Sequence, residues 1–128
     1  MSFEGVRTIG QIHVSVSDID RSVAFYRDVL GIRFLFDVPG RSMAFFDVGG
    51  IRLYLGRPET PDFRSTPILY FSVDDVDEAY DALRGRGVGF ADEPHVVHRT
   101  EQTELRMAFF TDPDGTNLAI MAERPVEA

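Results

Sequence analysis

The side chains best suited to chemistry stand near the start of the chain, in the stretch QIHVSVSD (11–18). Gln11 and His13 are two residues apart, so on a β-strand both point to the same face. A histidine at such a position can serve as an acid, a base or a metal ligand, because its ordinary pKa lies near neutrality. The alternative is a histidine held by hydrogen bonds in a semi-polar core. We expect His13 to line a cavity in either case.

The other two histidines, His95 and His98, lie in the segment EPHVVHRTEQTE (93–104). On a regular strand, residues three apart face opposite sides, which argues against a paired set of ligands. Glu104 closes the segment, and the sequence leaves open whether it reaches a cavity. Long polar segments of this kind often carry function.

Composition excludes several classes of function. The chain has 128 residues, a net charge of −8 and no cysteine, so a disulfide, a thiolate metal site and a cysteine nucleophile are all excluded. No cluster of basic residues is present that would bind a nucleic-acid backbone. No apolar run approaches membrane-spanning length, and the first ten residues, MSFEGVRTIG, lack the apolar core of a signal peptide. We therefore expect a cytoplasmic protein without nucleic-acid or membrane partners.

An internal repeat organises these residues. The tetrapeptide MAFF occurs at 43–46 and again at 107–110. The match extends to VSVSDIDRSVAFY (14–26) over FSVDDVDEAYDAL (71–83), and to GIRLYL (50–55) over GTNLAI (115–120), with small gaps between. Two copies of one unit therefore make up the chain. On a strand, one Phe of each MAFF packs under a helix and the other faces a cavity or the opposite unit.

Each copy predicts a strand, a helix and three further strands. Alternating apolar residues predict the first strand, and Asp18 and Asp75 are suited to N-cap the two helices. The later strands are predicted over 32–38, 42–48 and 51–56 in the first copy, and over 88–92, 104–110 and 117–123 in the second. We predict a single domain over 1–128, with βαβββ units at 7–57 and 67–124 and a proline-rich linker at 58–66.

The βαβββ repeat, the segment VSDIDRSVAFYRDVLG (16–31) and the DPDG turn (112–115) resemble the vicinal oxygen chelate superfamily. This group includes glyoxalase I, methylmalonyl-CoA epimerase, extradiol dioxygenases, and the fosfomycin and bleomycin resistance proteins. The resemblance implies an α+β fold in which the two units form an incomplete barrel around a central cavity, commonly in a homodimer. It does not imply one activity, because the fold hosts several chemistries.

The resemblance also implies where a divalent metal would bind. In the metalloenzymes of the superfamily, the first and last strands of each unit supply His, Gln or Glu ligands. The matching positions in this chain are Gln11, Tyr54, Ile68 and Ala119. Only Gln11 is an acceptable ligand, and a catalytic metal needs about three. We therefore predict no cofactor and no metal, with Gln11 and His13 as the two weak candidates for a rearranged site.

The cavity set predicted from strand alternation mixes aromatic rings, hydrogen-bonding groups and one cation. Its members are Gln11, His13, Ser15, Arg52, Tyr54, Tyr70, Asn117, Ala119 and Met121. Such a set suits a semi-polar organic molecule better than a bare ion, with the tyrosines available for stacking and Arg52 for a carboxylate.

Three functions remain open at this point. The first is metal-free binding of a small molecule, as the resemblance to bleomycin-type resistance proteins implies. The second is a metal-dependent lyase, epimerase or extradiol dioxygenase with a rearranged ligand set that holds Zn, Ni, Mn or Fe. The third is a metal-free enzyme in which His13 or Tyr54 acts as acid or base.

Overall fold

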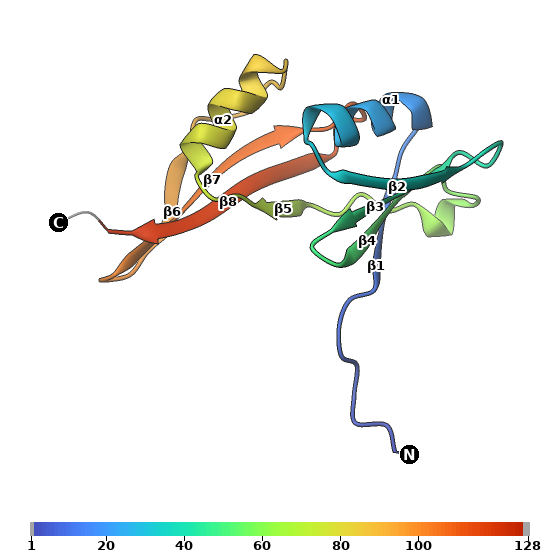
Figure 1. Cartoon of the computed structure of the whole chain (residues 1–128), viewed down its shortest axis with the longest axis horizontal. Coiled ribbons are helices and arrows are strands. Elements are labelled where there is room, and N and C mark those ends of the chain that lie inside the picture. The colour runs from blue at the N-terminus through green and yellow to red at the C-terminus, as the bar shows by residue number, and fades with distance from the viewer. Residues whose placement is uncertain (1, 127–128) are drawn as a thin grey trace.

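The computed structural model describes residues 2–126, and it has the two predicted βαβββ units side by side (Figure 1). The first sheet has the strand order β1-β4-β3-β2, and the second has the matching order β5-β8-β7-β6. In each unit the first strand runs parallel to the last, and the other neighbours are antiparallel. The predicted fold class, α+β with two repeated halves, is confirmed.

The first unit comprises β1 (Gln11–Ser15), α1 (Ile19–Ala24), β2 (Arg33–Val38), β3 (Met43–Val48) and β4 (Ile51–Gly56). Asp18 caps α1 through the backbone N–H of Arg21, as its sequence position predicts. The helical path continues as one π-helical turn, Phe25–Val29, and Gly31 then takes a positive φ of 73°. The π-helical turn, which is wider than an α-helical one, is a feature that the spacing of apolar residues alone does not predict.

The second unit comprises β5 (Leu69–Ser72), α2 (Val76–Gly85), β6 (His95–Arg99), β7 (Thr103–Thr111) and β8 (Asn117–Pro125). The predicted strand at 88–92 is wrong. Phe90 forms only one isolated bridge, to Phe110, and the Asp92 side chain accepts the Phe109 N–H that a strand neighbour would take. The strand beside β7 lies instead at His95–Arg99, inside the long polar segment 93–104.

One hydrophobic cluster joins the units. Helix α1 packs on β3 and β4, and α2 packs on β7 and β8, so that both helices cover the same side of the molecule in Figure 1. Phe46 and Phe110, the last residues of the two MAFF segments, are both buried in this cluster. Phe45 and Phe109 point to the face away from the helices, which confirms the predicted division of each pair.

The faces opposite the helices remain partly open. Tyr70 is 46% exposed on β5, and Phe36 is 45% exposed on β2. Within residues 2–126, no helix is long and apolar enough to span a membrane.

Candidate functional site

A row of four aromatic rings crosses the open face of the first sheet, one ring from each strand. His13, Tyr54, Phe45 and Phe36 are cross-strand neighbours, and we call them the aromatic row. The ring centroids of His13 and Tyr54 lie 4.5 Å apart. Tyr54 stacks on Phe45 at 5.0 Å, and Phe45 stacks on Phe36 at 4.8 Å. Strand pairing places these side chains opposite one another, and their contacts hold the rings in one continuous apolar surface.

The second sheet carries a shorter version of this row. Tyr70 and Phe109 flank Ala119 as its neighbours on β5 and β7, and their rings meet edge to face at 5.9 Å. Ala119 has no exposed surface. Met121 lies two residues further along β8, half-buried on the same face. The small side chain at Ala119 lets the two flanking rings approach each other.

Two cavities share lining residues at the connection between the units, and one of them lies at the end of the aromatic row. The first, which we call the aromatic cavity, has a volume of about 500 Å³ and is lined by Gln11, His13, Tyr54 and the linker residue Phe63, among others. The second, the polar cavity, has a volume of about 540 Å³ and lies between β1, the linker and the start of β8. Its lining includes the side chains of Ser15, Thr116 and Asn117. Arg57, Pro58 and Arg64 line both cavities.

Five of the nine predicted site residues therefore line one of the two adjoining cavities. Gln11, His13 and Tyr54 line the aromatic cavity, and Ser15 and Asn117 line the polar cavity. Arg52 and Tyr70 line a separate cavity of about 160 Å³. The Arg52 guanidinium lies 5.5 Å from the centre of the Phe45 ring, against the aromatic row. The arginines that reach the two larger cavities are Arg57, the last residue of the predicted first unit, and Arg64 of the predicted linker, and neither was among the predicted site residues.

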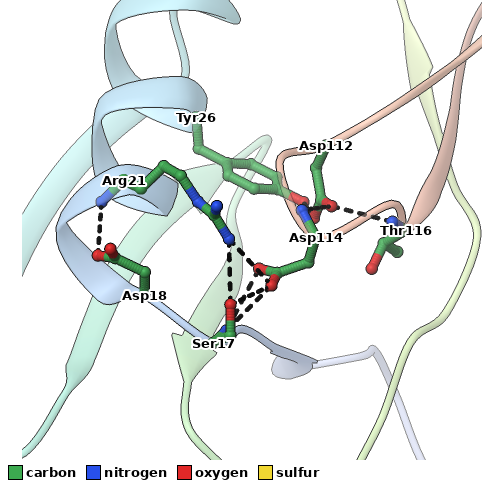
Figure 2. Close-up of polar contacts among 7 residues, drawn as sticks. All are labelled: Ser17, Asp18, Arg21, Tyr26, Asp112, Asp114 and Thr116. Carbon is green, nitrogen blue, oxygen red and sulfur yellow. Dashed lines mark hydrogen bonds and ion pairs between the residues drawn. The ribbon is translucent and has the colours of Figure 1, made fainter.

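A polar clamp holds the wall of the polar cavity in place (Figure 2). We define the clamp as Ser17, Arg21 and Tyr26 of the first unit with Asp112 and Asp114 of the DPDG turn. The Asp114 carboxylate accepts hydrogen bonds from the Ser17 hydroxyl at 2.5 Å and from Arg21 at 3.3 Å. The buried Asp112 carboxylate accepts the Tyr26 hydroxyl at 2.7 Å. Burial, together with the Asp112 charge, raises the pKa of the Tyr26 phenol, so it remains a donor at all working pH values.

The turn itself is fixed by the same carboxylate. Asp112 also accepts the backbone N–H groups of Asp114 at 2.9 Å and Thr116 at 3.0 Å. Gly115 has a φ of 83°, a left-handed conformation that suits glycine. The start of β8, and with it Asn117, is thereby set beside β1 of the other unit.

His13 and Tyr54 are electrically neutral at physiological pH. Burial lowers the pKa of His13, and the nearby Tyr54 backbone offsets part of this effect. Its Nε2 lies 3.2 Å from the Ser15 hydroxyl oxygen. Burial, followed by the nearby Glu59 charge, raises the pKa of the Tyr54 phenol. The aromatic cavity therefore presents uncharged rings, flanked by the ionic groups of the linker.

The lowered pKa of His13 predicts a pH-dependent stability. As the pH falls below 6.5, the ordinary pKa of histidine, the unfolded chain binds a proton before the folded chain does. The free energy of unfolding should therefore fall through this window, and the loss should be complete once the folded-state pKa has been passed. Urea unfolding at constant ionic strength across this window measures the effect. His13→Gln should flatten this part of the curve, and an unchanged curve would contradict the assignment.

The structure corrects the expectation for His95 and His98. A β-bulge between Val96 and His98 shifts the register, so that His95 pairs with Met107 and His98 pairs with Leu105. Met107 and Leu105 are two residues apart, so both histidines face the same side of the sheet and not opposite sides.

Glu104 lies on the helix-covered side of β7, away from the cavities. Its side chain is 7% exposed and accepts hydrogen bonds from Arg99 at 2.7 Å and Arg124 at 2.6 Å. These two arginines lower the pKa of Glu104. The network continues through Asp77 of α2, which pairs with Arg124 and Arg106. Glu104 thus joins β6, β7 and β8, and an ion-pair role accounts for it.

The ligand positions of the superfamily do not fit a metal in this chain. Ile68 has no donor atom, and Ala119 has none either and lies buried beside Tyr70 and Phe109. Gln11 and Tyr54 alone provide too few donors for a catalytic ion. Within residues 2–126, no group of three or more His, Cys, Asp or Glu side chains could hold a metal.

Comparison with known proteins establishes the family. The model of the Glyoxalase/Bleomycin resistance protein/Dioxygenase superfamily matches residues 8–120, and the chain belongs to this superfamily. The chain is 34% identical over 116 residues to metallothiol transferase FosB of Lysinibacillus sphaericus, covering 86% of this chain and 78% of that protein. It is 32% identical over 117 residues to the uncharacterized protein YraH of Bacillus subtilis, covering 81% of this chain and 89% of that one.

A solved structure of similar fold is TnmS3, an antibiotic binding protein from Streptomyces sp. CB03234. The two superpose with a TM-score of 0.73 at 27% identity, covering 92% of this chain and 97% of TnmS3. One superfamily therefore includes a relative named as a metallothiol transferase and a neighbour described as an antibiotic binding protein.

Proposed function

We propose that this protein binds a small, semi-polar organic molecule at the aromatic and polar cavities, without the metal site of its superfamily. The aromatic row is the observation that carries the proposal. The ring of Tyr54 lines the aromatic cavity and is backed by Phe45, so a planar ligand would meet a surface that is already ordered. The likeness to TnmS3 supports binding as the activity.

The proposal includes a homodimer. Tyr70 and Phe36 are large, exposed rings on the faces opposite the helices, and a second copy would cover them. Covering them would also complete the predicted barrel around a central cavity. Sedimentation velocity should show a dimer, and Phe36→Glu should shift it toward a monomer. A wild-type chain that is monomeric at all concentrations would contradict this part.

The cytoplasmic location stays a prediction.

The competing function is a metal-dependent enzyme, which the similarity to metallothiol transferase FosB favours. The purified protein should be incubated with Zn²⁺, Ni²⁺, Mn²⁺ and Fe²⁺, desalted and analysed for metal by mass spectrometry. We expect no stoichiometric ion, because Ile68 and Ala119 cannot serve as ligands. A stoichiometric ion would overturn the proposal. Its loss in Gln11→Ala and His13→Ala variants would then assign the rearranged site to those residues.

Binding itself is tested with neutral aromatic probes. Thermal-shift screening should find that naphthalene carboxamide stabilises the folded state, and titration calorimetry then gives its affinity. Tyr54→Ala should weaken this binding, whereas the exposed-surface control Asp81→Ala should not. Equal affinities of Tyr54→Ala and the wild type for the probe would show that the aromatic row is not part of the binding site.

A further inference from the structure

We infer that the ligand of the two cavities is an aromatic anion, with its ring in the aromatic cavity and its carboxylate or other anionic group in the polar cavity. This inference rests on the proposed function and adds the charge and orientation of the molecule bound. It depends on two arginines, Arg57 directly after β4 and Arg64 of the linker, which line both cavities.

The first step concerns the pairing of these arginines. Their backbone N–H groups are hydrogen-bonded to Ser42 and Pro61. Within residues 2–126, neither guanidinium has a hydrogen bond or an ion pair. By contrast, Arg21, Arg99 and Arg106 are all paired with carboxylates. In a chain with a net charge of −8, two arginines left unpaired beside a cavity are available for an anion from outside the chain.

The second step decides which cavity holds the anionic group. Glu59 and Asp62 of the linker also line the aromatic cavity, where their negative charges offset the positive charges of the two arginines. The polar cavity has a single carboxylate in its lining, that of Asp114, and the Ser17 hydroxyl and Arg21 already engage it. The uncompensated charge in the polar cavity is therefore positive. Hydroxyl and amide groups of Thr66, Thr116 and Asn117 complete a lining that suits a carboxylate.

The third step concerns the ring. The aromatic cavity has His13 and Tyr54 on the sheet side and Phe63 on the linker side. Phe63 is 71% exposed, so its ring has little contact with the rest of the chain. A planar ring placed between Phe63 and the aromatic row would cover apolar surface on both sides. The shared residues Arg57, Pro58 and Arg64 then lie beside the point where the ring joins its anionic group.

Three probes of the same shape test the inference: naphthalene carboxylate, naphthalene carboxamide and aminomethylnaphthalene. We expect the carboxylate to bind about tenfold more tightly than the carboxamide, the factor given by one charge-assisted hydrogen bond. The protonated amine should bind most weakly. Added salt should reduce the preference, because the arginines are exposed to solvent. Titration calorimetry at fixed pH and ionic strength gives all three affinities.

Matched variants assign the effect to the linker. Arg57→Gln and Arg64→Gln should each lower the affinity for the carboxylate and leave that for the carboxamide unchanged, and the double variant should bind both equally. Arg41→Gln is the control, since Arg41 is an exposed arginine that lines neither cavity. Thermal unfolding of each variant confirms that the fold is kept.

The outcomes separate the inference from the proposed function. Tight binding of the carboxamide with no preference for the carboxylate would overturn the inference that the ligand is an anion. The proposed aromatic binding site would still be supported. A preference that survives the double variant would also overturn the inference, because another cation would then be responsible. Binding of none of the three probes would overturn the proposed function together with the inference.

Discussion

Replacing Asp112 by Ala should lower the free energy of unfolding by about 3–5 kcal/mol. The carboxylate accepts three hydrogen bonds, from the Tyr26 hydroxyl and the N–H groups of Asp114 and Thr116. Tyr26 is fully buried, so its hydroxyl cannot turn to bulk water when the acceptor is removed. Each buried donor left without a partner costs about 1–3 kcal/mol. Urea unfolding followed by circular dichroism measures the change.

Tyr26→Phe provides the matched half of this experiment. It removes one hydrogen bond to a charged group and should cost about 1.5–3 kcal/mol. The double variant should be more stable than the sum of the single effects implies, since both remove the same contact. Asp81→Ala, at an exposed position on α2, is the control and should change the stability by less than about 0.5 kcal/mol. If Asp112→Ala behaves like that control, the clamp does not stabilise the fold.

Replacing Gly56 by Ala should weaken the binding of naphthalene carboxamide by about tenfold. A Cβ at Gly56 would lie 2.6 Å from Cε1 and 2.7 Å from the hydroxyl oxygen of Tyr54. Because a side chain moves more easily than a strand, the tyrosine ring gives way. It then loses its stacking on Phe45 and its contact with His13. Gly56 is in this sense a positioning residue for the aromatic row.

The free energy of unfolding should fall by about 1–3 kcal/mol, because two aromatic pairs of about 0.5–1.5 kcal/mol each are lost. The decisive comparison uses the Tyr54→Ala background, where no ring is left to displace. There, Gly56→Ala should have no further effect on the affinity of the probe. A wild-type affinity in Gly56→Ala alone would show that the orientation of Tyr54 does not matter for binding.

The sequence was sufficient for most of the fold, because strand alternation and the repeat reinforce each other. Residues 51–56 were predicted and observed as one strand, and His13 and Tyr54 were predicted to share a face. Strand alternation also implies that one Phe of each MAFF faces the helices and the other faces away, since neighbouring residues on a strand must face opposite sides. The aromatic row follows from these facts once the strand order is known.

The failures have equally local causes. The segment at 88–92 has a strand-like composition, yet the Asp92 side chain takes the place of a backbone acceptor beside β7. The faces of His95 and His98 depend on a bulge, which adds one residue and reverses the alternation beyond it. Arg57 and Arg64 were overlooked because they lie at and within the proline-rich connection, which was not considered as part of a site. Within the described residues 2–126 their guanidinium groups have no ion pair, and this matters for function only once the cavities are known.

The clamp also bears on how the chain acquires its structure during synthesis. Tyr26 and Asp112 are 86 residues apart, and Ser17 and Asp114 are 97 apart. A ribosome delivers these carboxylates long after Tyr26, so the buried phenol of the first unit has no acceptor until most of the second unit has been synthesised. Contacts of such high sequence separation slow folding and delay its completion. Although the gene is built from two similar halves, the first unit therefore gains its full set of buried hydrogen bonds only after the DPDG turn of the second unit has been made.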